Sequence, residues 1–337
     1  MIRVLTLNAW HGHVPKSALA VLNLEPPGHK AKRTSALLEE VRALSPDAIM
    51  LQECLPQPGF TDALARELGY DHVSKVCNSG VRIFGIGLPT GIGHGEGVSI
   101  LARKGLGLRV VAVRRLSGVG FATPKLAVQF GQLRFALAAE IEVEGRVVGL
   151  VNTHLRYAYP VYETFERAWR ELAARGALRG EPSRMLQRMV KSSLKVRDSE
   201  LWRLADLVRG FTHRGVPVVV GADFNLDHDT EQMLKFGSEL GLVNVLPTVD
   251  ARGHTWDPVG NPNIAFSMKS THPDGTPKNP LWLLTAHYDG VKQNPDHLMI
   301  GGALPKQALK EGGLAMHRSV AGVFPSDHYG IWADVAL

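Results

Sequence analysis

Cysteine and long apolar runs are both scarce in this sequence. Cys54 and Cys77 are the only cysteines among 337 residues, so no disulfide framework is implied. The chain opens with a strand pattern, Ile2 to Leu7, and lacks the basic-then-apolar pattern of a signal segment. It also has no apolar stretch long enough to span a membrane. These absences predict a cytoplasmic protein by default, or a secreted one if the chain is a mature form.

Two common catalytic signatures are missing as well. The glycine-rich stretch from Ser79 to Gly97 lacks the spacing of a Walker-type phosphate loop, so it predicts no nucleotide site. The sequence contains no Gly-x-Ser-x-Gly elbow, which argues against a serine hydrolase. It also contains no internal repeat at a fixed period. Any catalytic chemistry must therefore come from other side chains.

The charge balance is basic, with a net charge of +6 that favours anionic partners. Most of this excess lies in residues 157–214, which contain twelve Lys and Arg and seven Asp and Glu. This segment has a mainly helical pattern and an aromatic front, formed by Tyr157, Tyr159, Tyr162, Phe165 and Trp169. It can stack bases or lie at a lipid interface, or it can be a solvated helix with a core face. We expect one domain over residues 1–337, with residues 157–214 as a basic helical insert.

Residues 217–227 combine a buried strand with a polar end. Residues 218–220 are three valines closed by a glycine, which is typical of a strand buried on both faces. Asp223, Asn225 and Asp227 follow, alternating with two apolar residues. Alternation of period two predicts that the three polar side chains lie on one side, where they could hold a hard cation and position a water. The alternative is an Asx-turn that ends the strand.

Other predicted strands also run from apolar residues into a polar group. The polar candidates at strand ends are Asn8, Glu53, His154, Asp223, Asn225, Asp296, Asp327 and His328. Eight such groups predict one shared rim, where loops carry chemistry on a rigid sheet. The set is rich in oxygen and contains two histidines and no cysteine. It therefore favours Mg²⁺ or Mn²⁺ over structural zinc.

The order of these motifs resembles the endonuclease/exonuclease/phosphatase superfamily. The motifs are Leu7-Asn8, Leu51-Gln52-Glu53, Asn152-Thr153-His154-Leu155, Gly221-Ala222-Asp223-Phe224-Asn225, Pro295-Asp296-His297-Leu298 and Ser326-Asp327-His328-Tyr329. The resemblance covers nearly the whole chain. It implies an α/β fold, a four-layer α/β/β/α sandwich of two mixed β-sheets flanked by helices, with the active site at one end. It also implies an enzyme, a metal-dependent phosphoester hydrolase.

The resemblance also implies a metal site and its ligands. Glu53 would be the main ligand, with Asn8 beside it, and Asp327 would support the site. The implied cofactor is Mg²⁺ or Mn²⁺. The number of metal ions stays open at this point.

The remaining candidates take catalytic roles by the same resemblance. Asp223 would orient or deprotonate the attacking water, and Asn225 would bind the phosphate or hold that water. Asp296 would pair with His328, fixing its tautomer and favouring its charged form. His328 and His154 would donate to the phosphoryl oxygens, and one of them would protonate the leaving oxygen. Whether Asp223 or His328 is the base stays open.

The substrate class follows from two local motifs. The motif Asn152-Thr153-His154-Leu155 resembles the sphingomyelinase, secreted deoxyribonuclease and related phosphodiesterase branches, and Trp256-Asp257-Pro258 followed by Asn261 is similar to sphingomyelinases. A phosphodiesterase for a lipid headgroup or small diester is the favoured hypothesis, with a peripheral membrane contact through the aromatic front and Trp282. The alternatives are a DNA or RNA nuclease and a non-catalytic phosphate-binding scaffold.

Overall fold

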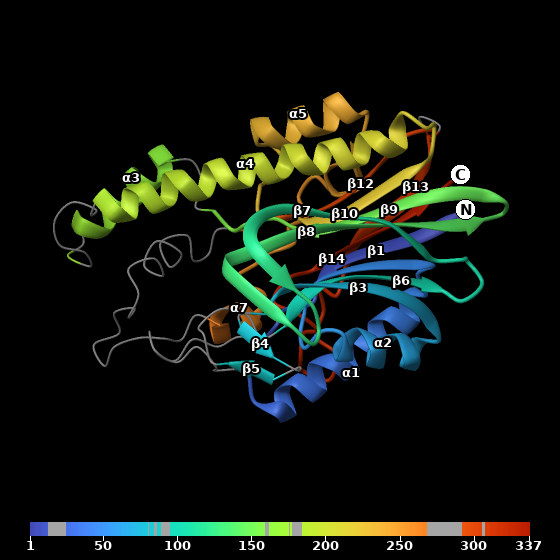
Figure 1. The fold of residues 1–337 in the computed structure, drawn as a ribbon, viewed down its shortest axis with the longest axis horizontal. Helices are drawn as coiled ribbons and strands as arrows, with labels where there is room; N and C mark the ends of the chain where they lie inside the picture. Colours follow the sequence, from blue (N-terminus) through green and yellow to red (C-terminus); the bar gives the residue numbers. More distant parts are fainter. Residues whose placement is uncertain are drawn as a thin grey trace.

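Two β-sheets pack face to face, with helices on their outer sides (Figure 1). The computed structural model describes residues 1–12, 25–79, 81–83, 86–88, 95–158, 162–174, 176, 184–267, 292–304 and 307–337. This is the four-layer α/β/β/α sandwich that the sequence predicts. No helix among the described residues is both long and apolar enough to cross a membrane.

The first sheet has six strands in the order β13-β14-β1-β2-β6-β3. Their bounds are β1 (Ile2–Asn8), β2 (Ala48–Cys54), β3 (Tyr70–Asn78), β6 (Glu96–Arg103), β13 (Leu309–Ala315) and β14 (Gly330–Val335). β1 and β2 are parallel, and the other pairs of this sheet are antiparallel. Helices α1 (Pro27–Leu44) and α2 (Gly59–Leu68) lie on its outer side, where Leu37 and Leu64 join an apolar cluster with strand residues.

The second sheet has eight strands in the order β11-β12-β10-β9-β8-β4-β5, with β7 also paired to β8. Their bounds are β4 (Val81–Ile83), β5 (Ile86–Leu88), β7 (Arg109–Ala122), β8 (Ala127–Val143), β9 (Arg146–His154), β10 (Val218–Asp223), β11 (Val243–Asn244) and β12 (Asp296–Gly301). Helices α4 (Arg184–Thr212) and α5 (Glu231–Leu240) cover it, and the remaining helices are α3 (Tyr162–Ala174), α6 (Val245–Val249) and α7 (Pro262–Ser267). β9 and β10 are parallel, so this sheet is also mixed.

β10 is the buried strand that its valines predict. Val218, Val219 and Val220 are fully buried. Val219 belongs to the apolar cluster between the two sheets, whereas Val218 and Val220 face the helical layer of α4 and α5. Burial on both faces explains why this strand is continuously apolar and does not alternate.

The turn breaks in the sequence predict two strands at residues 126–130 and 135–143, whereas the structure has one continuous strand, β8. Residues 11–30 follow no regular pattern in the sequence, and α1 begins within them at Pro27. Residues 162–174 and 184–212 of the insert are helical as predicted. Of the described side chains in its aromatic front, Trp169 is buried and Tyr157 is half exposed. Tyr159 and Trp282 lie outside the described residues, as do the side chains of Tyr162 and Phe165.

Candidate active site

Strand register brings most of the predicted site residues to one end of the sandwich. In the parallel pair β1–β2, Asn8 lies opposite Gln52, one residue before Glu53. In the second sheet, Asp223 lies opposite His154 on one side and opposite Asp296 on the other. The carboxyl ends of neighbouring parallel strands meet at the same edge of a sheet, and here both sheets present that edge at the same end.

The backbone turns sharply where β10 leaves the sheet. Asn225 has a φ of 52°, in the left-handed region, and its N–H donates to Asp223 Oδ1 at 2.9 Å. This is the Asx-turn alternative, and the predicted alternation therefore ends at Asp223. Phe224 is buried as predicted. Asp227 does not reach the site and instead accepts from the Asn294 N–H at 2.6 Å.

Asn8 and His154 contact Asp223 from both sheets. Asn8 Nδ2 donates to Asp223 Oδ2 at 2.9 Å, and His154 Nε2 lies 3.5 Å from the same oxygen. The Asn8 carboxamide oxygen accepts from the Trp10 N–H at 3.0 Å. The other predicted group here, Asn225, donates its carboxamide N–H to the Leu155 carbonyl at 3.0 Å. These bonds fix the orientation of Asp223 across the interface between the sheets.

Asp296 and His328 form the predicted pair. His328 Nδ1 lies 2.7 Å from Asp296 Oδ2, and both side chains are almost fully buried. The loop that carries His328 is held by Ser326, whose hydroxyl accepts from the His328 N–H at 3.1 Å and donates to the Asn8 carbonyl at 2.6 Å. The last residues of the chain are thereby anchored to the first strand.

Glu53 has a partner that sequence analysis missed. Its φ of 53° turns the carboxylate out of the strand, where it contacts the His11 ring and accepts from the His11 N–H at 3.2 Å. His154 Nδ1 lies 3.9 Å from its other oxygen. His11 follows β1 closely, and its position three residues after Asn8 was the signal that could have identified it.

The site crowds negative charge, and this shifts the acidity of its carboxyl groups. Burial and the neighbouring Asp296 charge raise the pKa of Asp223 to about 7. Burial, together with the charge of Glu53, raises the pKa of Asp327 to about 6. For Glu53, burial raises the pKa, but the charge of His11 and its hydrogen bond outweigh burial and hold the pKa well below its usual range.

The pKa values of the three histidines are shifted in different directions. Burial lowers the pKa of His328, but the charge of Asp296 and its hydrogen bond outweigh burial and raise the pKa well above its usual value. The Glu53 carboxylate likewise overcomes burial and raises the pKa of His11 to about 9. Burial and the Arg134 charge hold the pKa of His154 well below its usual range. At neutral pH, His328 is therefore protonated and His154 is neutral.

The donor set fits a hard divalent cation. Among the described residues, one ligand atom each from Asp223, Asp296 and His328 lies within 4.8 Å of the others, and Asp296 Oδ1 is buried with no hydrogen-bond partner. His328 is a poor ligand, however, because its contact with Asp296 retains the proton that a metal would displace. Glu53, which is ionised and turned outward, is the better anchor, and oxygen ligands suit Mg²⁺ or Mn²⁺.

Two buried clusters position the loops that carry these residues. The Arg33 guanidinium on α1 donates to the Trp10 carbonyl at 3.2 Å and to the Pro325 carbonyl at 2.7 Å, and it pairs with Glu25. The motif similar to sphingomyelinases has a structural role here: the Asn261 carboxamide donates to the Ser326 carbonyl at 2.9 Å. Both clusters support the segment that leads to Asp327 and His328.

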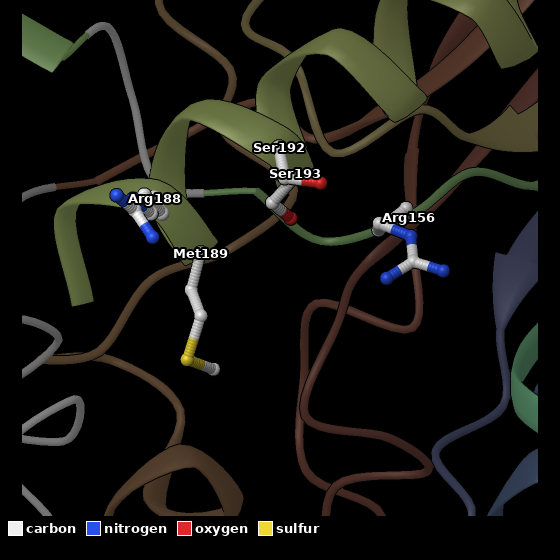
Figure 2. Close-up of a pocket in the computed structure, with 5 residues that line it drawn as sticks. All are labelled: Arg156, Arg188, Met189, Ser192 and Ser193. Carbon is white, nitrogen blue, oxygen red and sulfur yellow. The ribbon is translucent and has the colours of Figure 1, made fainter. Parts of the chain in front are cut away.

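A cavity lies between α4 and the segment that follows the predicted catalytic His154. It has a volume of about 520 Å³ and is lined by Arg156, Arg188, Met189, Ser192 and Ser193. Figure 2 shows Arg156 on the segment after β9 and the other four residues on α4, with open space between the two elements. In Figure 1 the amino-terminal part of α4 extends beyond the sheets. Arg156 is two residues from His154 in sequence, but the residues that line the cavity include none of the predicted site residues.

Comparison with known proteins agrees with this geometry. The sequence profile of the Endonuclease/Exonuclease/phosphatase family matches residues 5–183. No curated protein matches the chain. Among solved structures, Danio rerio TDP2 complexed with a single-strand DNA product is 16% identical, with a TM-score of 0.59 and coverage of 98% of this chain and 97% of that chain.

Two other solved structures have the same fold, and their names describe proteins different from TDP2. The catalytic domain of human Nocturnin, with a bound sulfate anion, is 17% identical, with a TM-score of 0.54 and coverage of 99% and 94%. A mannosyl-6-phosphatase of Bacteroides thetaiotaomicron is 14% identical, with a TM-score of 0.58 and coverage of 100% of both chains. At these identities the similarity establishes the fold and leaves the substrate open.

Proposed function

The chain belongs to the endonuclease/exonuclease/phosphatase family, and from that premise we propose that it is a phosphodiesterase for a lipid headgroup or another small phosphodiester. Members of the family are phosphoester hydrolases that generally depend on a divalent metal, so the chain is an enzyme of that class. The proposal concerns the finer question of which phosphoester it cleaves.

The observation that supports a diester is the excess of negative charge at the site. Glu53, Asp223, Asp296 and Asp327 converge there, and the raised pKa values of Asp223 and Asp327 show that further negative charge is disfavoured. A phosphodiester carries one negative charge at neutral pH, whereas a phosphomonoester carries up to two. The less charged substrate is therefore better suited to this group of carboxylates.

Each site residue takes a role that its environment supports. Glu53, with Asn8 and Asp327, would hold the divalent cation, which when bound supplies Lewis-acid stabilisation of the phosphoryl charge. Asp223 has a pKa of about 7 and would accept the proton of the attacking water. His328 retains its proton and is therefore a donor and not the base.

The remaining groups would stabilise the charge that develops on phosphorus. Neutral His154 would donate one hydrogen bond to a phosphoryl oxygen, and the protonated His328 would donate to another or to the leaving oxygen. Asn225 is held in place by its bond to the Leu155 carbonyl and would orient the water or the phosphate. The proposed attack of the water on phosphorus is in line with the leaving oxygen.

A nuclease is the second candidate, because basic residues lie close to the site. Arg156, two residues after His154, and Arg188 on α4 line one cavity, and the insert as a whole is basic. A phosphate backbone bound there would make affinity fall steeply with added salt. Met189 in the same cavity, which is half exposed, favours a ligand with an apolar part.

A panel of substrates separates these candidates. Purified protein would be assayed with sphingomyelin, bis- and mono-p-nitrophenyl phosphate, plasmid and single-stranded DNA, and RNA, each with Mg²⁺, with Mn²⁺ and with EDTA. We expect hydrolysis of the diesters, loss of activity with EDTA and recovery with added metal. Cleavage of nucleic acid alone would favour the nuclease, and activity that resists EDTA would contradict a metal-dependent reaction.

Glu53→Gln tests the site within the same assay. The substitution keeps the size of the side chain but removes the charge, so kcat should fall roughly 10²- to 10³-fold. Glu144→Gln is the matched control, since Glu144 is highly exposed in the β8–β9 turn and should retain full activity. Full turnover by Glu53→Gln, with the fold verified by circular dichroism, would refute the assignment.

A further inference from the structure

The β7–β8 hairpin exposes an apolar face that the proposed reaction does not use. Val119, Phe121, Leu126 and Phe130 are 65%, 45%, 46% and 73% exposed, and these four residues are called the hairpin face below. Val119 lies directly opposite Phe130 in the strand register, so their side chains share one side of the hairpin. Contiguous apolar surface of this kind marks an interaction site.

The hairpin face lies at the catalytic end of the sandwich. Ala136 pairs with Thr153, the residue before His154, so residues 127–134 of β8 run past the end of β9. At about 3.3 Å per residue, this part of β8 supplies roughly 26 Å of chain beyond the catalytic edge. Figure 1 shows β7 and β8 curving together at the end that also carries β4 and α7.

The hairpin is held rigidly by its other side. Ala122 and Ala127 are buried in the main core, Lys75 Nζ donates to the Ala122 carbonyl at 2.8 Å, and the Leu133 N–H donates to Asn78 Oδ1 at 3.0 Å. The curvature comes from irregular pairing in β7 around Gly118, whose φ is 85° and whose added Cβ would lie 2.3 Å from the Gln132 carbonyl oxygen. An anchored inner side means that the outer apolar side does not fold inward.

Charge indicates what covers this face. Residues 97–139 contain no Asp or Glu. Two basic residues of this stretch lie next to the hairpin face and are exposed: Arg115, which donates to the Gly120 carbonyl at 3.2 Å, and Lys125, which precedes Leu126. Apolar side chains rimmed by basic residues are the combination that binds the interface of an anionic bilayer, where apolar groups insert and cations approach the headgroups. An acidic or purely polar partner surface would leave the four apolar side chains uncovered.

We infer that the hairpin face docks the enzyme on an anionic lipid surface, with its catalytic end turned toward the bilayer. This inference rests on the proposed function, because it supplies the lipid-borne substrate to the same site. It also relocates the membrane contact from the aromatic front of the insert, where Trp169 is buried, to β7 and β8. The enzyme would then act on headgroups at the surface without extracting the lipid.

Vesicle binding by apolar variants tests the inference. Full-length protein would be cosedimented with vesicles of phosphatidylcholine alone and of equimolar phosphatidylcholine and phosphatidylserine. We expect binding to the anionic vesicles, and Phe130→Ser should lower the partition coefficient roughly tenfold. Leu234→Ser on α5 is the matched control, because Leu234 is 61% exposed on another part of the surface and should leave binding unchanged.

Charge reversal tests the basic rim separately. Lys125→Glu should lower binding to the anionic vesicles at least about fivefold, and added salt should weaken binding of the wild-type protein. Lys310→Glu is the control, since Lys310 is exposed in β13, near the opposite end of the sandwich from His328. Equal loss in Lys125→Glu and Lys310→Glu would contradict a specific rim.

Hydrolysis of soluble bis-p-nitrophenyl phosphate separates this inference from the proposed function. The hairpin variants should hydrolyse it at the wild-type rate, while Glu53→Gln should bind vesicles normally and fail to hydrolyse it. If the wild-type protein cleaves the soluble diester but ignores anionic vesicles, docking is refuted and the function stands. Docking is equally refuted if Phe130→Ser dissociates a dimer or weakens binding of single-stranded DNA while vesicle binding is unchanged.

Discussion

At the scale of single residues, the contact between Asp296 and His328 determines which group can donate a proton. Their side chains are 2.7 Å apart and buried, so the carboxylate holds the imidazole in its charged form. Asp223, only a few ångströms away, is driven toward its neutral form, because burial and the Asp296 charge raise its pKa to about 7. Environments that separate acid from base in this way are typical of hydrolytic sites.

Asp296→Asn should reduce kcat and change its pH dependence. Without the Asp296 carboxylate, burial still lowers the His328 pKa and only the smaller effects of the Asp327 and Asp223 charges raise it, so the pKa falls. The wild-type donor stays protonated as pH rises through neutrality, whereas the variant donor loses its proton. We expect kcat to fall roughly 10²- to 10⁴-fold at pH 8 and to recover partly on acidification.

The measurement is the kcat–pH profile of both proteins on the preferred substrate. Asp334→Asn provides the control, because Asp334 pairs with Arg3 at 2.7 Å in strands β14 and β1, far from the catalytic edge. Its profile should match that of the wild-type protein. An Asp296→Asn profile parallel to the wild-type one would show that Asp296 does not set the His328 proton.

Residues at strand ends could be located from sequence, but their partners in loops could not. Asp223 and His154 follow apolar strands, and parallel pairing makes their convergence a consequence of the strand pattern. His11 follows β1 in a stretch without periodicity, so its position three residues after Asn8 is a sequence signal that does not specify the contact with Glu53. The roles of all these residues in catalysis stay predictions until variants are assayed.

At the scale of elements, α1 connects two loops of the site through one side chain. Arg33 is 4% exposed and donates to the carbonyls of Trp10 and Pro325, which belong to the first and last loops of the chain. Its guanidinium lies over the Trp10 ring at 4.4 Å. Planar geometry with several donors is what allows one group to hold both loops, and a lysine has neither property.

Arg33→Lys should therefore lower kcat more than it lowers stability. It keeps the charge that Glu25 requires but cannot bond both loops, so the Asp327 and His328 loop should shift relative to Asn8. We expect a loss in kcat of roughly tenfold or more. Arg42→Lys on the same helix is the control: its pair with Glu67 is 3.4 Å long and exposed, so activity and melting temperature should be unchanged. If Arg33→Lys had the wild-type kcat, the prediction that Arg33 positions the two loops would be wrong.

Sequence patterns predicted the bounds of regular helices better than the pairing and curvature of long strands. Helix α5 runs over Glu231–Leu240 and ends at Gly241, as its pattern predicts, because an amphipathic helix with a glycine cap is a local signal. In the β7–β8 hairpin, the sequence pattern predicts several shorter strands, since irregular pairing around Gly118 interrupts the alternation that marks a strand. The same interruption hides the exposed face of the hairpin from a sequence pattern.

At the scale of the molecule, the order of the motifs was sufficient to predict the sandwich, but not how closely its sheets approach. A buried polar bridge joins the sheets beneath the site: Gln52 Nε2 donates to Asn152 Oδ1 at 2.8 Å, and Asn152 Nδ2 donates to the Ser99 carbonyl at 2.7 Å. Distances across a sheet interface depend on side-chain volumes from distant parts of the chain. A pattern read along the chain does not contain them.

At Gly221, two residues before Asp223, the backbone of β10 lies close to side chains of the other sheet. A Cβ at Gly221 would lie 2.6 Å from Met50 Cε and 2.9 Å from Thr6 Cβ, both in the opposite sheet. Gly221→Ala should therefore push the sheets apart and lower the free energy of unfolding by about 1–3 kcal/mol. It should also lower kcat, because the 2.9 Å bond between Asn8 and Asp223 crosses the same interface.

Urea unfolding and kcat measurements on the same preparations would check this expectation. Gly210→Ala is the control, since a Cβ there meets nothing within 4 Å, and alanine in the last turn of α4 should stabilise the protein by up to about 0.5 kcal/mol. Opposite signs for the two glycine substitutions would show that sheet separation, and not the added methyl group itself, is responsible. If Gly221→Ala were as stable and as active as the wild-type protein, the geometry of the site would not depend on the spacing between the sheets.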